Sequence, residues 1–124
     1  MATMLIPQLV VRDMAEALAF YTEKLDFRFA FAWPEERPIY AGLMRGADEM
    51  HLILSPGQGR YGHCGAVVLC EDVDGVFAAF QARGLVFPTR PDSPVHVAPL
   101  DQSWGTREFY VDDPCGNTLI FQQR

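Results

Sequence analysis

Residues 107–121 of this chain read REFYVDDPCGNTLIF. The first five alternate polar and apolar side chains and include the aromatic and branched types that favour strands. Asp113-Pro114-Cys115-Gly116-Asn117 then reverses the chain, because proline fits the first central position of a type I turn and Gly116 can adopt the positive φ that follows. Residues 118–121 return as a second strand. The stretch therefore predicts a closing β-hairpin.

The first half of the chain predicts a strand, a helix and three further strands. Residues 5–11 form an apolar run, and Asp13 with Glu16 makes a capping box that begins a helix. The apolar stripe of this helix consists of Met14, Ala17, Leu18, Tyr21 and Leu25. Strands are predicted at residues 27–33, 39–44 and 50–54, separated by turn-forming residues.

The second half repeats this plan. Residues 9–14, LVVRDM, correspond to residues 68–73, VLCEDV, so a strand again ends in a helix-capping aspartate, Asp72. The next apolar stripe consists of Val73, Val76, Phe77 and Phe80, and Gly84 ends the helix. Compared with the first half, the second has a longer, proline-rich excursion at residues 88–105, and such loops often carry function.

Two copies of a βαβββ unit predict an α+β fold with eight strands, pseudo-twofold symmetry and a cleft inside the curled sheets. At 124 residues the chain is expected to be a single domain, 1–124, with repeats at about 4–55 and 63–123 and a glycine-rich linker at 56–62.

Composition narrows the class of partner. The net charge of -6 argues against nucleic acid or an anionic membrane, since both attract basic surfaces. No apolar run approaches the roughly 20 residues of a membrane-spanning helix. The N-terminus has no basic segment before its apolar residues, and the three cysteines show no CxxC spacing, so a cytoplasmic protein is expected.

Motifs at both ends of the chain resemble a known superfamily. Val11-Arg12-Asp13-Met14, Ala19-Phe20-Tyr21 and Asp113-Pro114-x-Gly116-Asn117, on a paired βαβββ plan, resemble the vicinal oxygen chelate superfamily, which includes glyoxalase I, extradiol dioxygenases, and fosfomycin- and bleomycin-resistance proteins. Ile6-Pro7-x-Leu9-x-x-Arg12-Asp13 and the segment 104–109, WGTREF, are most similar to the bleomycin-binding members. The shared patterns specify a fold better than an activity.

The resemblance maps the superfamily's metal-ligand positions onto Ile6, Ile53, Gly65 and Ile120. None of these side chains can bind a metal, which needs imidazole, thiolate or carboxylate donors. We therefore expect no metal and no cofactor, and the isomerase, dioxygenase and thiol-transferase chemistries of the superfamily are not predicted. A one-residue slip would bring in Gln8, Leu54, Cys64 or His63, but it would also turn the side chain to the opposite face of the sheet.

No catalytic residue is predicted from spacing. His51, His63 and His96 show neither HxH nor HExxH spacing. The serines Ser55, Ser93 and Ser103 have no nucleophile elbow around them, and no base is indicated for the cysteines Cys64, Cys70 and Cys115. His51 shares a strand face with Ile53, so it is a candidate to line the cleft.

Aromatic and acidic residues are the better candidates for a ligand-binding site. Phe29, Phe31 and Trp33 alternate along one strand, and Tyr40 begins the next. Flat ligands stack on such rings, and cationic groups gain from cation–π contact and from carboxylates at Glu35, Glu36, Asp101 and Glu108. The predicted ligand-binding residues are Phe31, Trp33, Tyr40, His51, Trp104, Glu108 and Phe109. Two alternatives to a role in binding stay open. One is that Phe29 and Phe31 are core residues. The other is that Arg107 and Glu108 are a cross-strand pair on the surface.

The resemblance also implies a homodimer, because in the bleomycin-binding proteins the N-terminal strand crosses to the partner subunit, with a proline such as Pro7 at the hinge. The sequence and the resemblance together favour sequestration of a bulky, partly cationic antibiotic of the bleomycin type, without metal and without catalysis. The alternatives are a metal-dependent glyoxalase-like lyase or dioxygenase, and a binding module for another metabolite.

Overall fold

The computed structural model describes residues 3–57 and 59–124; Met1, Ala2 and Gln58, the last of which falls in the expected linker, lie outside the described residues. The first module contains β1 (Gln8–Val11), α1 (Met14–Ala19), η1 (Phe20–Lys24), β2 (Arg28–Trp33), β3 (Tyr40–Arg45) and β4 (Asp48–Leu54). The second contains β5 (Gly65–Leu69), α2 (Val73–Ala82), η2 (Pro94–His96), β6 (Leu100–Asp101), β7 (Arg107–Asp112) and β8 (Thr118–Gln123).

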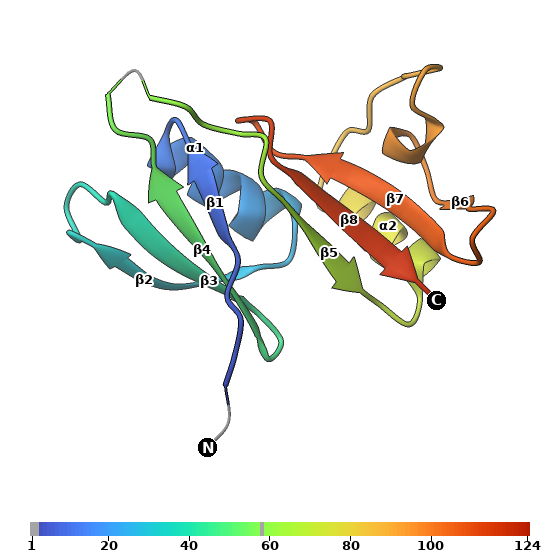
Figure 1. The fold of residues 1–124 in the computed structure, drawn as a ribbon, viewed down its shortest axis with the longest axis horizontal. Helices are drawn as coiled ribbons and strands as arrows, with labels where there is room; N and C mark the ends of the chain where they lie inside the picture. Colours follow the sequence, from blue (N-terminus) through green and yellow to red (C-terminus); the bar gives the residue numbers. More distant parts are fainter. Residues whose placement is uncertain (1–2, 58) are drawn as a thin grey trace.

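The eight strands form two four-stranded sheets with equivalent topology, which confirms the paired βαβββ plan. The strand orders are β1-β4-β3-β2 in the first sheet and β5-β8-β7-β6 in the second. Only β1–β4 and β5–β8 are parallel pairs. In Figure 1 the two sheets lie side by side, and the helices α1 and α2 lie behind them. Each sheet thus has one face covered by its own helix and one open face.

The helices form where the capping residues predict. Asp13 accepts a hydrogen bond from the backbone N–H of Glu16, and Asp72 accepts one from that of Gly75. The buried side chains of the first helical segment include Met14, Ala17 and Tyr21, and those of α2 include Val73 and Phe80. Each stripe packs on the inward residues of its sheet, so the core is apolar and continuous through both modules.

Strand boundaries differ from expectation at the N-terminus. The first strand was expected from residue 5, but β1 begins at Gln8 because Pro7 has no N–H to donate to the ladder. The Pro7 carbonyl still accepts a 2.9 Å bond from the His51 N–H. Leu5, before the proline, is 97% exposed, so it is not the buried strand residue that the apolar run predicted.

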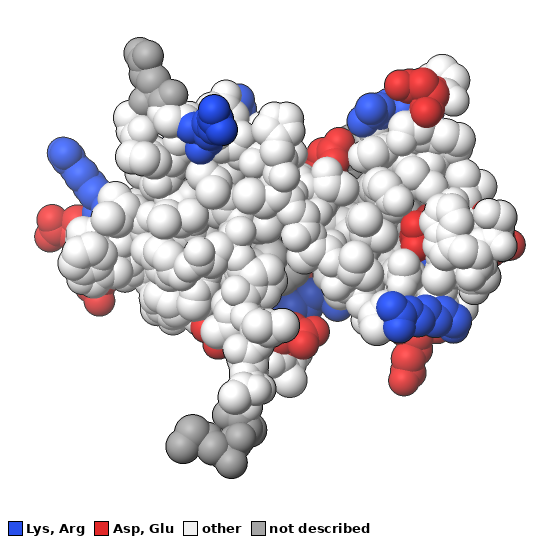
Figure 2. Space-filling model, viewed as in Figure 1, with Lys and Arg blue, Asp and Glu red and all other residues white. Residues whose placement is uncertain are grey.

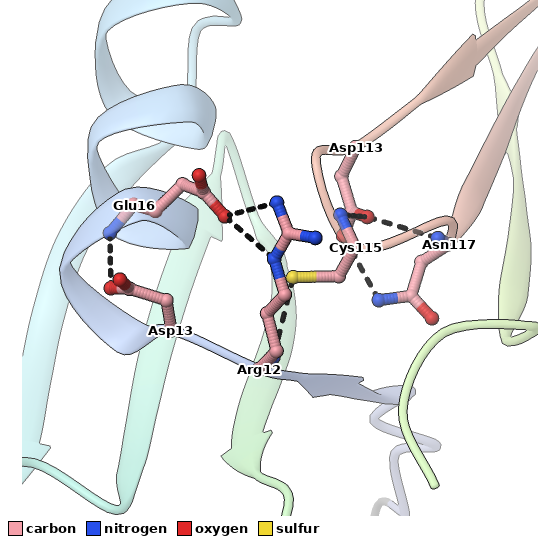
Figure 3. A network of polar contacts seen from close by, with 6 residues as sticks. All are labelled: Arg12, Asp13, Glu16, Asp113, Cys115 and Asn117. Carbon is pink, nitrogen blue, oxygen red and sulfur yellow. Dashed lines mark hydrogen bonds and ion pairs between the residues drawn. The ribbon is translucent and has the colours of Figure 1, made fainter.

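The turn between β7 and β8 holds the two modules together. Asn117 is fully buried; its side-chain nitrogen donates to the Val10 carbonyl at 2.9 Å, and its side-chain oxygen accepts from the Cys64 N–H at 3.1 Å. Asp113 accepts hydrogen bonds from the N–H groups of Cys115 and Asn117. In Figure 3 this turn faces the start of α1, and the Cys115 sulfur accepts from the backbone N–H of Arg12 at 3.3 Å. The predicted turn geometry at Gly116 is present, with φ of 88°.

Tyr21, in the first helical segment, also contacts the turn between β7 and β8, and this turn with its contacts forms the joint between the modules. Its hydroxyl donates to Asp113 at 2.8 Å, and the side chain is fully buried. Burial, together with the adjacent Asp113 carboxylate, raises the pKa of Tyr21 far above its usual value near 10. The Asp113 carboxylate is therefore buried beside a neutral hydroxyl and amide donors, which satisfy it without a cationic side chain among these contacts.

Candidate functional site

The open face of the first sheet is built by strand register. Side chains of directly paired residues point to the same side of a sheet. Tyr40 pairs with Ile53, and Gly42 pairs with His51, which also pairs with Gln8 on the other side. Leu43 pairs with Met50 on the opposite, helix-covered face, where both are buried. The face away from α1 therefore carries Gln8, Tyr40, Gly42, His51 and Ile53.

Gly42 makes room for an aromatic ring on this face. A Cβ built on Gly42 would lie 2.1 Å from Cε1 of Phe31, so the ring of Phe31 occupies the space above the glycine. The Phe31 ring lies nearly parallel to Tyr40, at 6.3 Å and 18°, and edge-on to His51, at 5.4 Å and 84°. Phe31 remains 41% exposed, so its ring is accessible. Phe31, Tyr40 and His51 together form the aromatic floor of this face.

A chain of hydrogen bonds runs along one side of that floor. The Gln8 amide donates to the Tyr40 hydroxyl at 2.6 Å, and the Tyr40 hydroxyl lies 2.6 Å from Nδ1 of His51. Nε2 of His51 contacts the Glu49 carboxylate. A neutral imidazole with its proton on Nε2 donates to Glu49 and accepts from Tyr40, which in turn accepts from Gln8. These hydrogen bonds hold the rings of Tyr40 and His51 in place and end at the carboxylate of Glu49, which is partly exposed.

Trp33 extends the floor, and a bulge removes Phe29 from it. Trp33 pairs with Tyr40 and is 64% exposed. The register of β2 shifts between Phe29 and Phe31, so Phe29 pairs with Leu43 and Phe31 with Gly42. The expectation that Phe29, Phe31 and Trp33 share one face was therefore wrong for Phe29, because the extra residue in the bulge reverses the alternation.

The site residues expected from the second module are divided between surface and interior. Trp104 is 65% exposed in the turn before β7. Phe109 is fully buried, stacked on Phe121 at 5.1 Å and edge-on to Phe77 at 5.3 Å. It was expected in the binding cleft, but it is a core residue, because strand alternation turns it toward α2.

Glu108 is 2% exposed, so it is not half of a surface pair with Arg107. Its carboxylate accepts hydrogen bonds from Thr106, Tyr110 and Gln122, at 3.0, 3.3 and 2.6 Å. Burial and this carboxylate raise the pKa of Tyr110. Arg107 instead contacts Asp74 and Asp101, and its guanidinium lowers the pKa of Asp74. The Glu108 carboxylate is thus buried in the second sheet, with three side-chain donors.

Of the positions that correspond to metal ligands, Ile53, Gly65 and Ile120 lie in strands β4, β5 and β8, and Ile6 precedes β1. Ile53 pairs with Val10, and Ile120 pairs with Val67 and Tyr110. Gly65 pairs with Thr118. Within residues 3–57 and 59–124, no three His, Cys, Asp or Glu side chains are grouped so that they could hold a metal ion.

The other two histidines lie away from the aromatic floor. His63 follows the linker with a positive φ of 59°, and its N–H donates to the Gly116 carbonyl, so it belongs to the joint between the modules. His96 lies in η2, against Tyr110.

Of the seven predicted residues, four meet on the first sheet: Phe31, Trp33, Tyr40 and His51. Gln8, Gly42 and Glu49 were missed as members, because only the register shows that they share this face.

The surface around both open faces is largely uncharged. Figure 2 shows Lys, Arg, Asp and Glu mainly around the edge of the molecule, with few over the middle of the sheets. Exposed apolar side chains include Phe31, Trp33 and Ile39 on the first module and Val67 and Leu69 on the second. A hollow of about 360 Å³ between the two sheets is lined by residues such as Leu5, Glu49 and Val67. Among the described residues, no helix has the length and apolar character needed to cross a membrane.

Comparisons with known proteins agree with this architecture. A family described as the Glyoxalase/Bleomycin resistance protein/Dioxygenase superfamily matches residues 3–121. Among solved structures, the bleomycin resistance determinant encoded on the transposon Tn5 is 22% identical, with a TM-score of 0.79 and coverage of 99% of this chain and 98% of that one.

Two further structures show the same fold. The bleomycin-binding protein of the bleomycin producer Streptomyces verticillus, complexed with copper(II)-bleomycin, is 24% identical, with a TM-score of 0.75 over 98% of this chain and 97% of that one. A lactoylglutathione lyase from Agrobacterium tumefaciens is 16% identical, with a TM-score of 0.71 over 99% and 94% of the two chains. No sequence among the curated proteins matches this chain. At these identities the structural likeness shows the fold alone.

Proposed function

This chain belongs to the glyoxalase/bleomycin resistance protein/dioxygenase superfamily, and within that family we propose that it is a small-molecule binding protein that sequesters a flat, partly cationic antibiotic of the bleomycin type. Binding alone would provide the protection, because a bound drug is kept from its target. No bond in the antibiotic needs to change, and no metal is required of the protein.

The observation that carries this proposal is the Phe31 ring held over Gly42 beside Tyr40. A flat heteroaromatic group stacks on such rings, and Trp33 extends the stacking surface to the end of the strand. Glu49 places a carboxylate at the end of the hydrogen-bond chain, where a cationic group of the ligand would be attracted. Four aromatic or imidazole rings with one carboxylate are the chemistry that such a ligand needs.

We further propose that the functional unit is a homodimer. Leu5, Val67 and Leu69 are all more than half exposed, and monomeric proteins seldom leave large apolar patches open to water. In a dimer, Trp104 of the second module would be available to close a groove over the aromatic floor of the first. The oligomeric state is tested by light scattering or sedimentation over a range of protein concentrations.

The decisive experiment is an equilibrium titration of chelator-treated protein with bleomycin, followed by tryptophan fluorescence and checked by calorimetry. We expect saturable binding with one ligand per chain and a dissociation constant of micromolar or tighter, about -8 kcal/mol. Tyr40→Phe with Phe31→Ala should weaken binding at least about tenfold, whereas Gln81→Ala, an exposed residue of α2, should not. An absence of binding up to about a millimolar would refute the antibiotic assignment.

A second candidate function is favoured by the contact between His51 and Glu49. An imidazole and a carboxylate are two of the donors that zinc, nickel or iron uses, and a third could come from a second chain or a substrate. A metal-dependent lyase or dioxygenase would then operate on the same face. About one tightly held metal ion per chain after purification without chelator, lost in His51→Ala, would support this candidate. If neither metal nor bleomycin binds, a screen of other flat cationic metabolites tests the remaining alternative.

A further inference from the structure

The excursion at residues 88–105 packs on β7, at one side of the open face of the second sheet, and leaves Val67 and Leu69 of β5 exposed. The short helix η2 within it places His96 edge-on to Tyr110, with ring centroids 5.3 Å apart at 74°. The His96 side chain is 14% exposed, so packing holds its ring in place while a small part of it stays accessible. This segment thus fixes an imidazole on the second module, away from the aromatic floor of the first.

Both nitrogens of His96 have partners. Nδ1 lies 2.6 Å from the Ser93 hydroxyl, and Nε2 lies 3.2 Å from Oδ1 of Asp112. Because a carboxylate only accepts, it holds the imidazole proton on Nε2, which leaves the lone pair of Nδ1 for the proton of the Ser93 hydroxyl. Serine, histidine and aspartate are therefore arranged as nucleophile, base and orienting acid.

Asp112 is itself fixed in place. Its Oδ1 accepts from the Thr118 hydroxyl at 2.6 Å, and its Oδ2 accepts from the Arg90 guanidinium at 3.4 Å. These contacts come from β8 and from the start of the excursion, so the carboxylate cannot easily turn away from His96. Asp112 acts through His96 and is a positioning residue.

We propose that Ser93 is an activated nucleophile that hydrolyses small activated esters. Ser93 Oγ bonds to the ester carbonyl carbon as its proton passes to Nδ1 of His96, and the alcohol leaves with that proton as the ester C–O bond breaks. Water then attacks the acylated serine; its proton passes through His96 to Ser93 Oγ, and the carboxylic acid departs. The balance requires only the ester and water.

The same turn supplies an apolar surface for the acyl group. A shallow hollow beside it is lined mainly by apolar side chains, including Pro91, Pro94, Val97 and Leu100. Pro94 and Val97 are chain neighbours of Ser93 and His96. Ser93 and His96 do not line the hollow themselves, but residues next to them in the chain do. An apolar lining in this segment favours short, uncharged acyl groups, and acetyl and butyryl esters are the class to test. This activity does not depend on antibiotic binding, because it uses none of the residues proposed for the antibiotic site.

The test uses the full chain with p-nitrophenyl acetate and with a fluorophosphonate, which labels activated serines. We expect turnover above the buffer rate, a fall of about 100-fold or more in kcat/KM for Ser93→Ala and for His96→Gln, and no change for Ser103→Ala, an exposed serine in the β6–β7 turn. Mass spectrometry should place the label on Ser93. Asp112→Asn should lower kcat with little change in KM, which a purely structural role would not produce.

Two results would overturn the proposal. One is equal hydrolysis by the native chain and by Ser93→Ala when circular dichroism shows both folded. The other is fluorophosphonate labelling that is absent, or that falls on another residue. In either case Ser93, His96 and Asp112 form only a clasp that holds the excursion to β7.

Discussion

The side-chain amide of Asn117 donates a 2.9 Å hydrogen bond to the backbone carbonyl of Val10, which connects the last turn of the chain to its first strand. The same side chain accepts from the Cys64 N–H at the start of the second module. A residue that a sequence pattern places simply in a hairpin turn is thus the point where both modules meet. The orientation of the two open faces depends on it.

Replacing Asn117 with alanine should therefore destabilise the whole chain. The change leaves the Cys64 N–H without its side-chain acceptor, and it removes one donor from the Asp113 carboxylate and one from the Val10 carbonyl, which still accepts from the Gly62 N–H. A buried group left unsatisfied costs about 1–3 kcal/mol. We expect the free energy of unfolding to fall by about 2–4 kcal/mol. Urea denaturation followed by circular dichroism measures it. The control is Gln102→Ala, whose amide bonds only within its own turn, and an equal midpoint for the two variants would contradict the role of the joint.

Tyr21 should make the stability fall in alkali. Its pKa is raised by burial and by Asp113, so the folded state keeps a proton that the unfolded state loses near pH 10. The contribution of this group is therefore intact below about pH 10 and declines above it, by up to about 1.4 kcal/mol for each pH unit.

The matched variant is Tyr21→Phe, which has no hydroxyl to titrate. It should be less stable by about 1–3 kcal/mol near neutral pH, because Asp113 loses a donor, but its stability should decline less steeply between about pH 10 and 11. Unfolding midpoints at several pH values measure both quantities. Parallel curves for the two proteins would show that Tyr21 is not the titrating group.

Local patterns predict most of the fold but only part of the candidate site. The caps at Asp13 and Asp72 and the turn at Gly116 depend on neighbouring residues, and all three were found as expected. The separation of Phe29 from Phe31 depends on a bulge, and the burial of Phe109 depends on which side of β7 faces α2. Neither is fixed by local composition.

The spacing of residues along the sequence does not predict contacts between distant segments. The Gln8–Tyr40 bond joins residues that are far apart in the chain, and it forms only because β1 and β3 both flank β4. Ser93 and Asp112 likewise meet through His96, because η2 folds back onto β7. Serine, histidine and aspartate at these positions show no motif, so the sequence alone indicated no catalytic group.

Gly42→Ala should disturb ligand binding more than folding. Its new Cβ would overlap the Phe31 ring, but that ring is partly exposed and can swing outward. We expect a loss of less than about 1 kcal/mol in the free energy of unfolding and about a tenfold loss of bleomycin affinity, because the aromatic floor is displaced. Calorimetric titration of Gly42→Ala, Phe31→Ala and the double variant tests the shared cause. Fully additive losses would mean that the glycine acts independently of the ring.

Trp104, in the turn before β7, and Phe109, within that strand, should respond in opposite ways to truncation. Phe109→Ala removes a ring that is stacked on Phe121 in the core, and it should lower the free energy of unfolding by about 3–5 kcal/mol. Trp104→Ala removes a mainly exposed side chain and should change it by no more than about 0.5 kcal/mol, while weakening bleomycin binding if the groove forms as proposed. Denaturation followed by circular dichroism, which does not rely on the tryptophan signal, compares them directly. If Trp104→Ala were the more destabilising variant, the turn before β7 would be part of the core and could not present Trp104 to a ligand.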